Sequence, residues 1–177
     1  MKIIKEAKTF EKVTTELLIV GVQKNCSHIK GWDGFVSFYD GQVEDCIRSR
    51  DINTDRKQMT KIPYVGKNKN LKRILFVGLG DPKSLTENEL RDTFGLVGKQ
   101  LRTLKTNDFT IWLESFTASP IDENDIAYLA AEGIGLGFYT IPHYKTTSNE
   151  QDCYLDNVHF VTEADIDEIA ASFEVGR

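Results

Sequence analysis

The sequence predicts a single α/β domain in which a mixed, largely parallel sheet is flanked by helices. Short apolar runs alternate with segments of helical period, and this alternation is typical of α/β domains. Two runs, Leu17–Val22 and Ile74–Leu79, are apolar throughout apart from a glycine. Such strands are covered on both faces, as the central strands of a parallel sheet are. A chain of 177 residues, 40% of them hydrophobic, is long enough to form one such core.

Three weaker runs predict further strands. Met1–Lys5 predicts an edge strand, whereas Phe109–Leu113 and Val158–Val161 are rich in β-branched and aromatic residues. The basic stretch Arg56–Arg73 holds seven Lys or Arg and no acid. Turn residues at Gly66–Asn70 favour a hairpin-like connection, whose lysines suit an edge strand. The alternative interpretation of the stretch is a groove for an anion or a nucleic acid.

Periodicity and capping residues predict the helices. The strongest pattern spans Thr86–Lys105, where Thr86 and Glu89 form a capping box ahead of one apolar stripe. A second helix is expected to begin near Ile121–Asp125 and to continue through Ile134. Carboxylates cluster at this start and again after residue 162, where negative charge stabilises a helix end. They are interpreted as mainly solvated: Asp122, Glu123, Asp125, Glu163, Asp165, Asp167 and Glu168.

Two shorter helices complete the prediction. One follows Thr162, because apolar residues then recur every three or four positions: Ile166, Ile169, Ala170 and Phe173. The other lies between Asp33 and Arg50. The polar stretch Thr140–Asp156 is the most loop-like part of the chain.

Composition argues against several classes of protein. The longest apolar runs are six residues, far short of the ~20 that a membrane span needs, and no signal-peptide pattern opens the chain. Cys26, Cys46 and Cys153 are odd in number and never form C-x-x-C, so neither a disulfide framework nor a cysteine zinc site is indicated. We therefore expect a cytoplasmic protein.

The charge is unevenly distributed along the chain. Residues 1–75 hold 15 basic and 9 acidic residues, giving +6, whereas residues 76–177 hold 7 and 18, giving −11. Such charges favour contact between the two halves or with a neighbouring subunit. A net charge of −5 argues against nucleic-acid binding as a class of function.

Two glycine patterns resemble phosphate-binding loops. Gly78-Leu79-Gly80 lies between a strand and a capped helix, where backbone N–H groups can hold a phosphate. It lacks the third glycine of a dinucleotide fingerprint and the Gly-Lys-Ser/Thr of a P-loop, so a tight turn is the favoured interpretation. The Gly133, Gly135 and Gly137 series lies within a helical pattern, which favours close helix packing.

Few residues suit catalysis. Cys26 and His28 are two potential metal ligands, and Cys153 with His159 resembles a thiol–imidazole pair, but each set lacks the further ligand or orienting group that such sites require. His143 is interpreted as a surface or packing residue. We therefore predict no catalytic, cofactor-binding or metal-binding residue in this chain.

Two passages resemble the amino-terminal domain of the cytosolic leucine aminopeptidases. The first is Arg73-Ile-Leu-Phe-Val-Gly-Leu-Gly80 followed by Leu90-Arg91-x-x-x-Gly95. The second is Glu132-Gly133-x-x-Leu136-x-x-Tyr139 followed by Tyr144-Lys145. The order and spacing match over most of residues 70–177 and only loosely over residues 1–69. Ile141-Pro142-His143 departs from the family pattern just before the Tyr-Lys pair.

The resemblance implies a macro-domain-like fold over residues 1–162, with residues 163–177 as a linking helix toward a catalytic domain. In this family the catalytic domain binds two divalent metals, zinc or manganese, and the parent releases amino-terminal residues from peptides as a hexamer. Asn53-Thr54-Asp55 echoes a family metal motif, but Arg56-Lys57-Gln58 follows where the family requires Ala-Glu-Gly. The resemblance thus implies a non-catalytic domain whose partners are its own catalytic domain and other subunits.

Two other functions remain open at this point. A macro-like domain is a candidate module for ADP-ribose or a nucleotide, held at the Gly78–Gly80 turn. A small Cys–His hydrolase based on Cys153 or Cys26 is the second alternative.

Overall fold

A computed structural model of the protein describes residues 2–4, 9–139 and 155–177. A mixed sheet of six strands lies at its centre in the order β1-β6-β5-β2-β4-β3. Every pairing is parallel except that of β3 with β4, so β3 is an antiparallel edge strand. The strands are β1 (Lys2–Ile4), β2 (Leu17–Gln23), β3 (Met59–Pro63), β4 (Arg73–Gly80), β5 (Asp108–Trp112) and β6 (Asn157–Val161).

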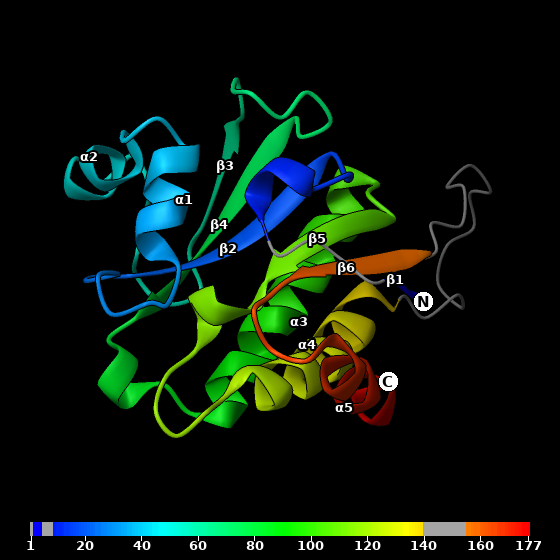
Figure 1. Ribbon diagram of the computed structural model, residues 1–177. Helices are drawn as coiled ribbons and strands as arrows, with labels where there is room; N and C mark the ends of the chain where they lie inside the picture. The colour runs from blue at the N-terminus through cyan, green and yellow to red at the C-terminus, as the bar shows by residue number, and fades with distance from the viewer. Residues whose placement is uncertain (1, 5–8, 140–154) are drawn as a thin grey trace, which may run out of the picture.

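Helices cover both faces of this sheet (Figure 1). The short helices α1 and α2 lie on one face, and the longer helices α3, α4 and α5 form a layer on the other. The α-helices are α1 (Trp32–Phe38), α2 (Val43–Arg48), α3 (Glu87–Leu104), α4 (Glu123–Phe138) and α5 (Ile166–Gly176). Three 3-10 turns lie in the connections: η1 (Phe10–Lys12) between β1 and β2, η2 (Pro82–Ser84) between β4 and α3, and η3 (Leu113–Phe116) between β5 and α4.

The central strands are buried on both faces, as their continuous apolar runs predict. In β2, Leu17 and Ile19 pack into the core beneath α3–α5, whereas the alternate Leu18 and Val20 pack into the core beneath α1. The α1 side contains a cluster of aromatic rings in contact with one another: Phe10, Trp32, Phe35, Phe38 and Trp112. Because successive side chains of a strand point to opposite faces of the sheet, β2 contributes alternate residues to the two cores.

The prediction of one short helix between Asp33 and Arg50 was wrong, because α1 and α2 replace it. The helix is interrupted at Asp40 and Gly41, whose φ angles are 55° and 74°. That left-handed region cannot continue a right-handed helix, and the glycine adopts it without steric cost. The strand expected to reach Leu113 ends one residue earlier, since Leu113 begins η3.

The predicted helix starts are confirmed. Thr86 Oγ1 accepts the Glu89 N–H of α3, and Asp122 Oδ1 accepts two N–H groups in the first turn of α4. Asp165 caps α5 by accepting the Asp167 N–H at 2.8 Å. Each cap satisfies backbone donors that have no partner within the helix.

The basic stretch forms β3 and its hairpin to β4, which confirms the edge-strand interpretation. Arg56 is paired with Glu89 on α3 at 2.6 Å, and Lys57 lies 3.6 Å from Asp92. Tyr64 is buried, and its ring stacks on Phe38 with centroids 4.9 Å apart. The stretch therefore packs against the domain by means of ordinary ion pairs and ring contacts.

None of the helices in the described ranges combines the length and the apolar character that a membrane span requires.

Candidate functional site

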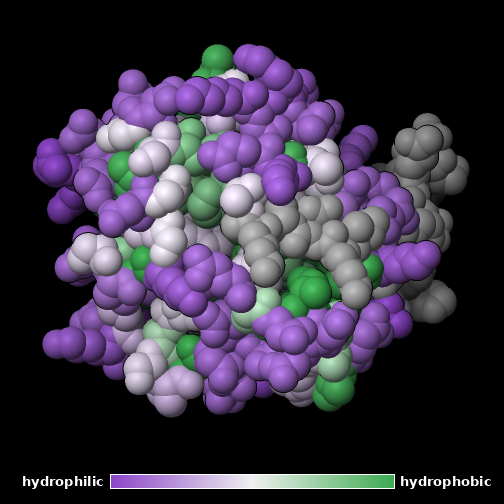
Figure 2. All heavy atoms as spheres, in the orientation of Figure 1, coloured by the Kyte–Doolittle hydropathy of each residue, from purple (hydrophilic) through white to green (hydrophobic). Residues whose placement is uncertain are grey.

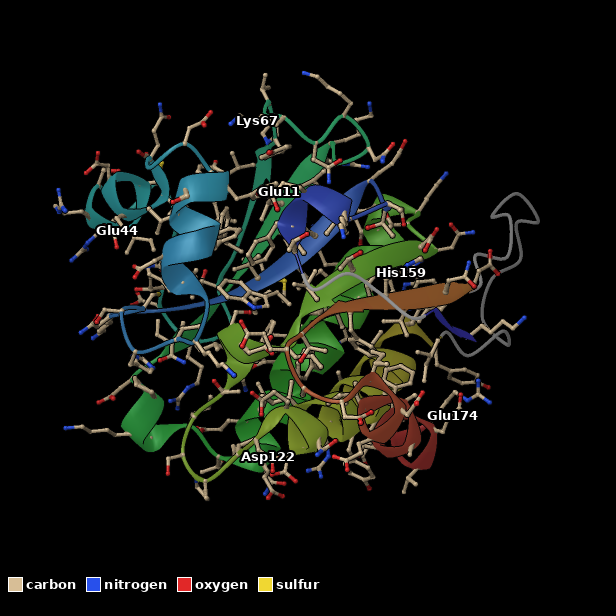
Figure 3. The ribbon with its side chains drawn as sticks, viewed as in Figure 1. Glu11, Glu44, Lys67, Asp122, His159 and Glu174 are labelled. Atoms are coloured by element: carbon tan, nitrogen blue, oxygen red, sulfur yellow. The ribbon has the colours of Figure 1, made fainter. Side chains whose placement is uncertain are left out.

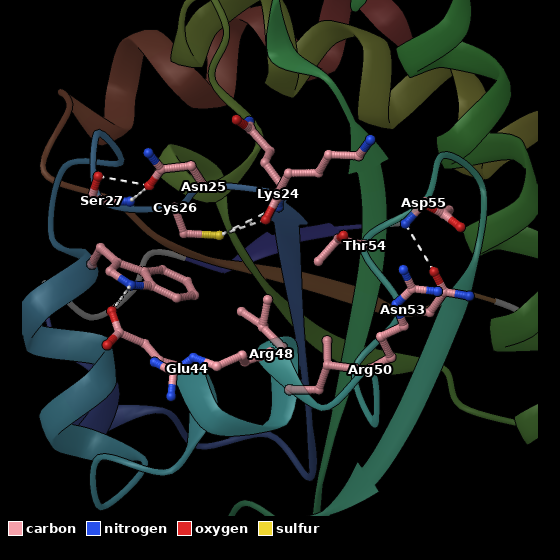
Figure 4. A pocket seen from close by; sticks show the side chains of 14 residues that line it. Lys24, Asn25, Cys26, Ser27, Glu44, Arg48, Arg50, Asn53, Thr54 and Asp55 are labelled. Carbon is pink, nitrogen blue, oxygen red and sulfur yellow. Dashed lines mark hydrogen bonds between the residues drawn. The ribbon is translucent and has the colours of Figure 1, made fainter.

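A cavity of about 640 Å³ opens where β2 ends (Figure 4). Such a position is physically reasonable for a ligand site, because crevices in open α/β sheets form beyond the carboxyl ends of the strands. Its walls come from the turn after β2, from α2 and from the segment that leads toward β3. The lining residues are Gln23, Lys24, Asn25, Cys26, Ser27, Trp32, Glu44, Ile47, Arg48, Arg50, Ile52, Asn53, Thr54 and Asp55.

Several polar groups of the cavity form hydrogen bonds with other lining residues. The Trp32 indole N–H donates to Glu44 Oε1 at 3.2 Å, and the Ser27 hydroxyl donates to Asn25 Oδ1 at 2.7 Å. Arg48 is paired with Asp45 of its own helix at 3.0 Å. The lining mixes both signs of charge, so it suits a small polar ligand better than an apolar one.

Cys26 is unsuited to act as a nucleophile in this cavity. Its side chain is buried, and its thiol donates to the Gln23 carbonyl at 3.2 Å. Burial raises the pKa of the Cys26 thiol to about 11, with only partial compensation from the Gln23 backbone. A thiolate is the reactive form of cysteine, and this environment disfavours it at neutral pH.

The Gly78–Gly80 turn is already engaged by the protein. The Gly78 N–H donates to the Gln58 carbonyl at 2.7 Å, and the Gly80 N–H donates to the Thr54 carbonyl at 2.9 Å. A Cβ on Gly78 would collide with the Asp55 carbonyl, so the segment before β3 covers the turn closely. These two N–H groups are therefore not free to hold a phosphate. The turn predicted at these residues lies further along the chain, because Gly78–Gly80 form the end of β4 and the 3-10 turn η2 begins at Pro82.

The other candidate residues do not converge. Cys26 is buried while the nearby His28 is exposed, so they do not form a joint ligand pair. His159 is buried on β6, with its Nε2 2.7 Å from Asp108 Oδ1. In the ranges that the structure describes, no group of three or more His, Cys, Asp or Glu is placed to hold a metal. Residues His143 and Cys153 lie outside those ranges, as do Tyr144 and Lys145.

One buried acid was missed by sequence reasoning. Glu114, in η3, is only 2% exposed, and its Oε1 accepts the Thr162 hydroxyl and the Glu163 N–H, both at 2.7 Å. These bonds tie the end of β5 to the end of β6. Burial raises the pKa of the Glu114 carboxyl despite the two donors. The sequence offers little signal for this burial: Glu114 stands between Leu113 and Ser115-Phe116, and periodicity alone does not separate such a position from a surface one.

The two passages that carry the family resemblance meet on facing helices. Arg91 of α3 is paired with Glu132 of α4. Gly95 lies against Gly137, where an added Cβ would collide with the Gly95 carbonyl, and a Cβ on Gly133 would collide with the Arg91 carbonyl. The predicted close packing thus holds for Gly133 and Gly137. It fails for Gly135, because nothing lies within 4 Å of the position its Cβ would take.

The fold places the chain in the class of macrodomain-like α/β domains. It superposes on the macrodomain of Mycobacterium tuberculosis DarG with a TM-score of 0.60 and 11% identity, covering 89% of this chain and 96% of that one. For a macrodomain of Oceanobacillus iheyensis the TM-score is 0.63 and the sequence identity 12%, and the match covers 98% of this chain and 88% of that one. For a variant of tomato leucine aminopeptidase the TM-score is 0.74 and the sequence identity 14%, and the match covers 99% of this chain. That match spans only 35% of the tomato chain, so the present chain corresponds to about a third of its length.

Residues 19–148 match the model of the cytosol aminopeptidase family, N-terminal domain. The chain belongs to that family. The resemblance found in the motifs is therefore confirmed.

Proposed function

We propose that this chain serves as the non-catalytic amino-terminal domain of a leucyl aminopeptidase, with roles in subunit assembly and in access to the active site. The observation that carries the proposal is the match of nearly the whole chain to a minor part of tomato leucine aminopeptidase, together with the family match. In this proposal a cytoplasmic parent releases amino-terminal residues by two-metal hydrolysis. Its partners are a catalytic domain and further subunits of a hexamer.

The described side chains do not fit the two divalent metals that such a parent requires. Two-metal hydrolysis needs clustered ligands that generate hydroxide and polarise the scissile carbonyl. Asp55, the closest echo of a family ligand, has its backbone N–H bonded to Asn53 Oδ1 and lies beside Arg56, with no acidic cluster around it in the described ranges. We assign the zinc or manganese to the catalytic domain, and no catalytic step to this chain.

An activity assay tests this proposal directly. The purified chain is incubated with leucine p-nitroanilide in the presence of zinc or manganese, and no release of p-nitroaniline above a protein-free control is expected. Turnover that disappears on adding a chelator would show that the chain itself assembles a metal centre. Turnover that survives the chelator but disappears in Cys26→Ala or Cys153→Ala would favour the Cys–His hydrolase instead.

A binding module for ADP-ribose or a nucleotide is the second candidate. The cavity beyond β2 favours it, because its lining includes Lys24 and Arg50 beside a buried indole. The covered Gly78–Gly80 turn argues against the placement of a phosphate there. Calorimetric titration with ADP-ribose separates the two functions: we expect no heat of binding at micromolar ligand. Micromolar affinity that is lost in Arg50→Ala would establish the binding module.

A further inference from the structure

Two cations of the cavity beyond β2 have no acidic partner. In the part of the chain that the structure describes, neither Lys24 nor Arg50 forms an ion pair, and both residues are exposed. The third cation of the lining, Arg48, is paired with Asp45 of its own helix. In Figure 4, Arg50 lies on the side of the cavity that carries Thr54, and the Lys24 side chain extends toward that side. That side therefore presents unpaired positive charge.

The opposite side of the cavity presents a carboxylate with free hydrogen-bonding capacity. Glu44 Oε1 accepts the Trp32 indole N–H at 3.2 Å, and Oε2 accepts no hydrogen bond from the residues that the structure describes. Burial raises the pKa of the Cys26 thiol most, and the charge of Glu44 raises it further, so the field of this carboxylate reaches the cavity. Figure 4 shows Glu44 across the cavity from Arg50.

The unpaired charges of the lining balance one another. Lys24 and Arg50 are matched in number by Glu44 and Asp55, since Arg48 is already paired within α2. Asp55 lies on the side of the two cations, so that side keeps a net positive charge while the Glu44 side is negative. A ligand that carries one charge of each sign, held apart, is complementary to this arrangement. A diphosphate is not, because it brings two negative charges and no positive one.

The size of the cavity sets how far apart those two ligand charges lie. A sphere of 640 Å³ is about 11 Å across. The ammonium and carboxylate groups of a free amino acid share one Cα atom, so they cannot reach opposite sides of such a space. An extended chain spans roughly 3.3–3.6 Å per residue, which gives about 10–11 Å for a tripeptide. The termini of a short peptide therefore have the required separation.

We propose that this cavity binds a di- or tripeptide through its two terminal charges. The ammonium group of the peptide binds the free Oε2 of Glu44, and its terminal carboxylate binds Lys24 and Arg50. Ile47 and Ile52 line the space between them and provide apolar contact for a peptide side chain.

The binding site stands on its own lining, and only its meaning rests on the proposed function. Peptides are the class of molecule on which the proposed parent acts, so the cavity holds a substrate or a shortened product within a domain that does not cleave it. Cys26, the one nucleophilic side chain of the lining, is buried and disfavoured as a thiolate. We therefore assign peptide binding, and no cleavage, to this cavity.

Calorimetric titration of the full chain with the tripeptide Leu-Gly-Gly tests the proposal. Saturable binding is expected at millimolar peptide. The N-acetylated peptide and the peptide with an amidated carboxyl terminus should each bind at least about tenfold more weakly, because each lacks one charge-assisted hydrogen bond. Free leucine should also bind more weakly, because its two charges cannot span the cavity.

Substitutions assign each terminal charge to its side of the cavity. In Glu44→Gln the acetylated and free peptides should bind with equal affinity, and in the double variant Lys24→Ala, Arg50→Ala the amidated and free peptides should do so. The matched controls are Glu11→Gln and Lys67→Met, which remove exposed charges outside the cavity and should change neither preference. Circular dichroism and the thermal midpoint verify that each variant is folded.

Three results overturn the proposal: no saturable binding at millimolar peptide, equal affinity of the wild type for the free and blocked peptides, or displacement of the peptide by micromolar ADP-ribose. Mass spectrometry of the recovered peptide separates this inference from the proposed function. A shortened peptide would show that the chain itself hydrolyses peptides, which contradicts the proposed function, whereas an intact peptide that does not bind contradicts the inference alone.

Discussion

Individual glycines decide how closely α3 and α4 approach. Gly137 has the Gly95 backbone where a side chain would be, whereas Gly135, two residues away on the same helix, faces open space. The same substitution therefore has opposite effects at the two sites, since the conformational gain from alanine is common to both and only one of them clashes.

Gly137→Ala is expected to lower the free energy of unfolding by about 1–3 kcal/mol, because the methyl group overpacks the helix contact. Gly135→Ala should raise it by about 0.5–1 kcal/mol, because alanine is the better helix former. Urea denaturation followed by circular dichroism measures both. Equal effects of the two substitutions would show that the helix contact is looser than described.

Glu114 imposes a pH-dependent cost on the fold. Burial raises its pKa in the folded state above the ordinary value of 4.5, so the charged form is less stable in the folded chain than in the unfolded one. The cost is complete above the raised pKa and fades as pH falls through it to below 4.5. Glu114→Gln keeps an acceptor for the Thr162 hydroxyl and the Glu163 N–H while it removes the charge.

We therefore expect Glu114→Gln to gain stability relative to the wild type as pH rises from about 4 to 7. The difference in the free energy of unfolding at each pH, from urea titrations, is the measurement. Glu168→Gln is the control: it removes an exposed charge near the start of α5, where negative charge is favourable, so it should lower stability at pH 7. A pH-independent difference for Glu114→Gln would contradict the description of its site.

At the scale of elements, the start of α3 depends on one side chain. Thr86 Oγ1 accepts a hydrogen bond from the Glu89 N–H, and the Glu89 carboxylate accepts one from the Thr86 N–H. The same carboxylate forms an ion pair with Arg56. The cap therefore anchors both the helix and the segment that covers the Gly78–Gly80 turn. Elements that are distant in sequence share this one anchor.

Thr86→Ala should lower the free energy of unfolding by about 1 kcal/mol, because the capped N–H groups lose their acceptor. Thr103→Ala on the exposed side of the same helix is the matched control, and it should be neutral or slightly stabilising, because alanine has the higher helix propensity. Thermal and urea midpoints of the two variants give the comparison. An equal loss in both would assign the effect to threonine chemistry in general rather than to the cap.

At the scale of the whole molecule, one sheet joins two cores and opposite charges join two halves of the chain. Lys30, Arg56 and Lys57 pair with Glu163, Glu89 and Asp92, so cations from the first half meet acids from the second. In Figure 3, Asp122 and Glu174 lie on the side of the helical layer, whereas Lys67 lies on the opposite side together with the acids Glu11 and Glu44. The face shown in Figure 2 is mostly hydrophilic, with scattered apolar atoms.

Both tryptophans, Trp32 and Trp112, report on the α1 side of the sheet, whereas Phe173 is buried on the α5 side. Phe173→Ala should lower the free energy of unfolding by about 3–5 kcal/mol. Because the two cores share the same strands, the urea transition followed by tryptophan fluorescence should shift as far as the one followed by circular dichroism. A circular dichroism transition that moves alone would show that the two faces unfold independently.

The sequence by itself determined the fold class, both central strands, the starts of α3, α4 and α5, and the family. Those features depend on local signals: apolar runs, helical period and capping residues within a few positions of one another. It did not locate the interruption between α1 and α2, although Asp40-Gly41 is a turn dipeptide whose residues adopt left-handed φ angles, because the prediction treated residues 33–50 as one segment.

Only the tertiary structure decided what each candidate site residue does. Whether the Gly80 N–H is free depends on Thr54, whether Cys26 is reactive depends on its burial, and whether Glu114 is solvated depends on Thr162. These partners lie far from one another in sequence, and only the folded backbone brings them within hydrogen-bonding distance.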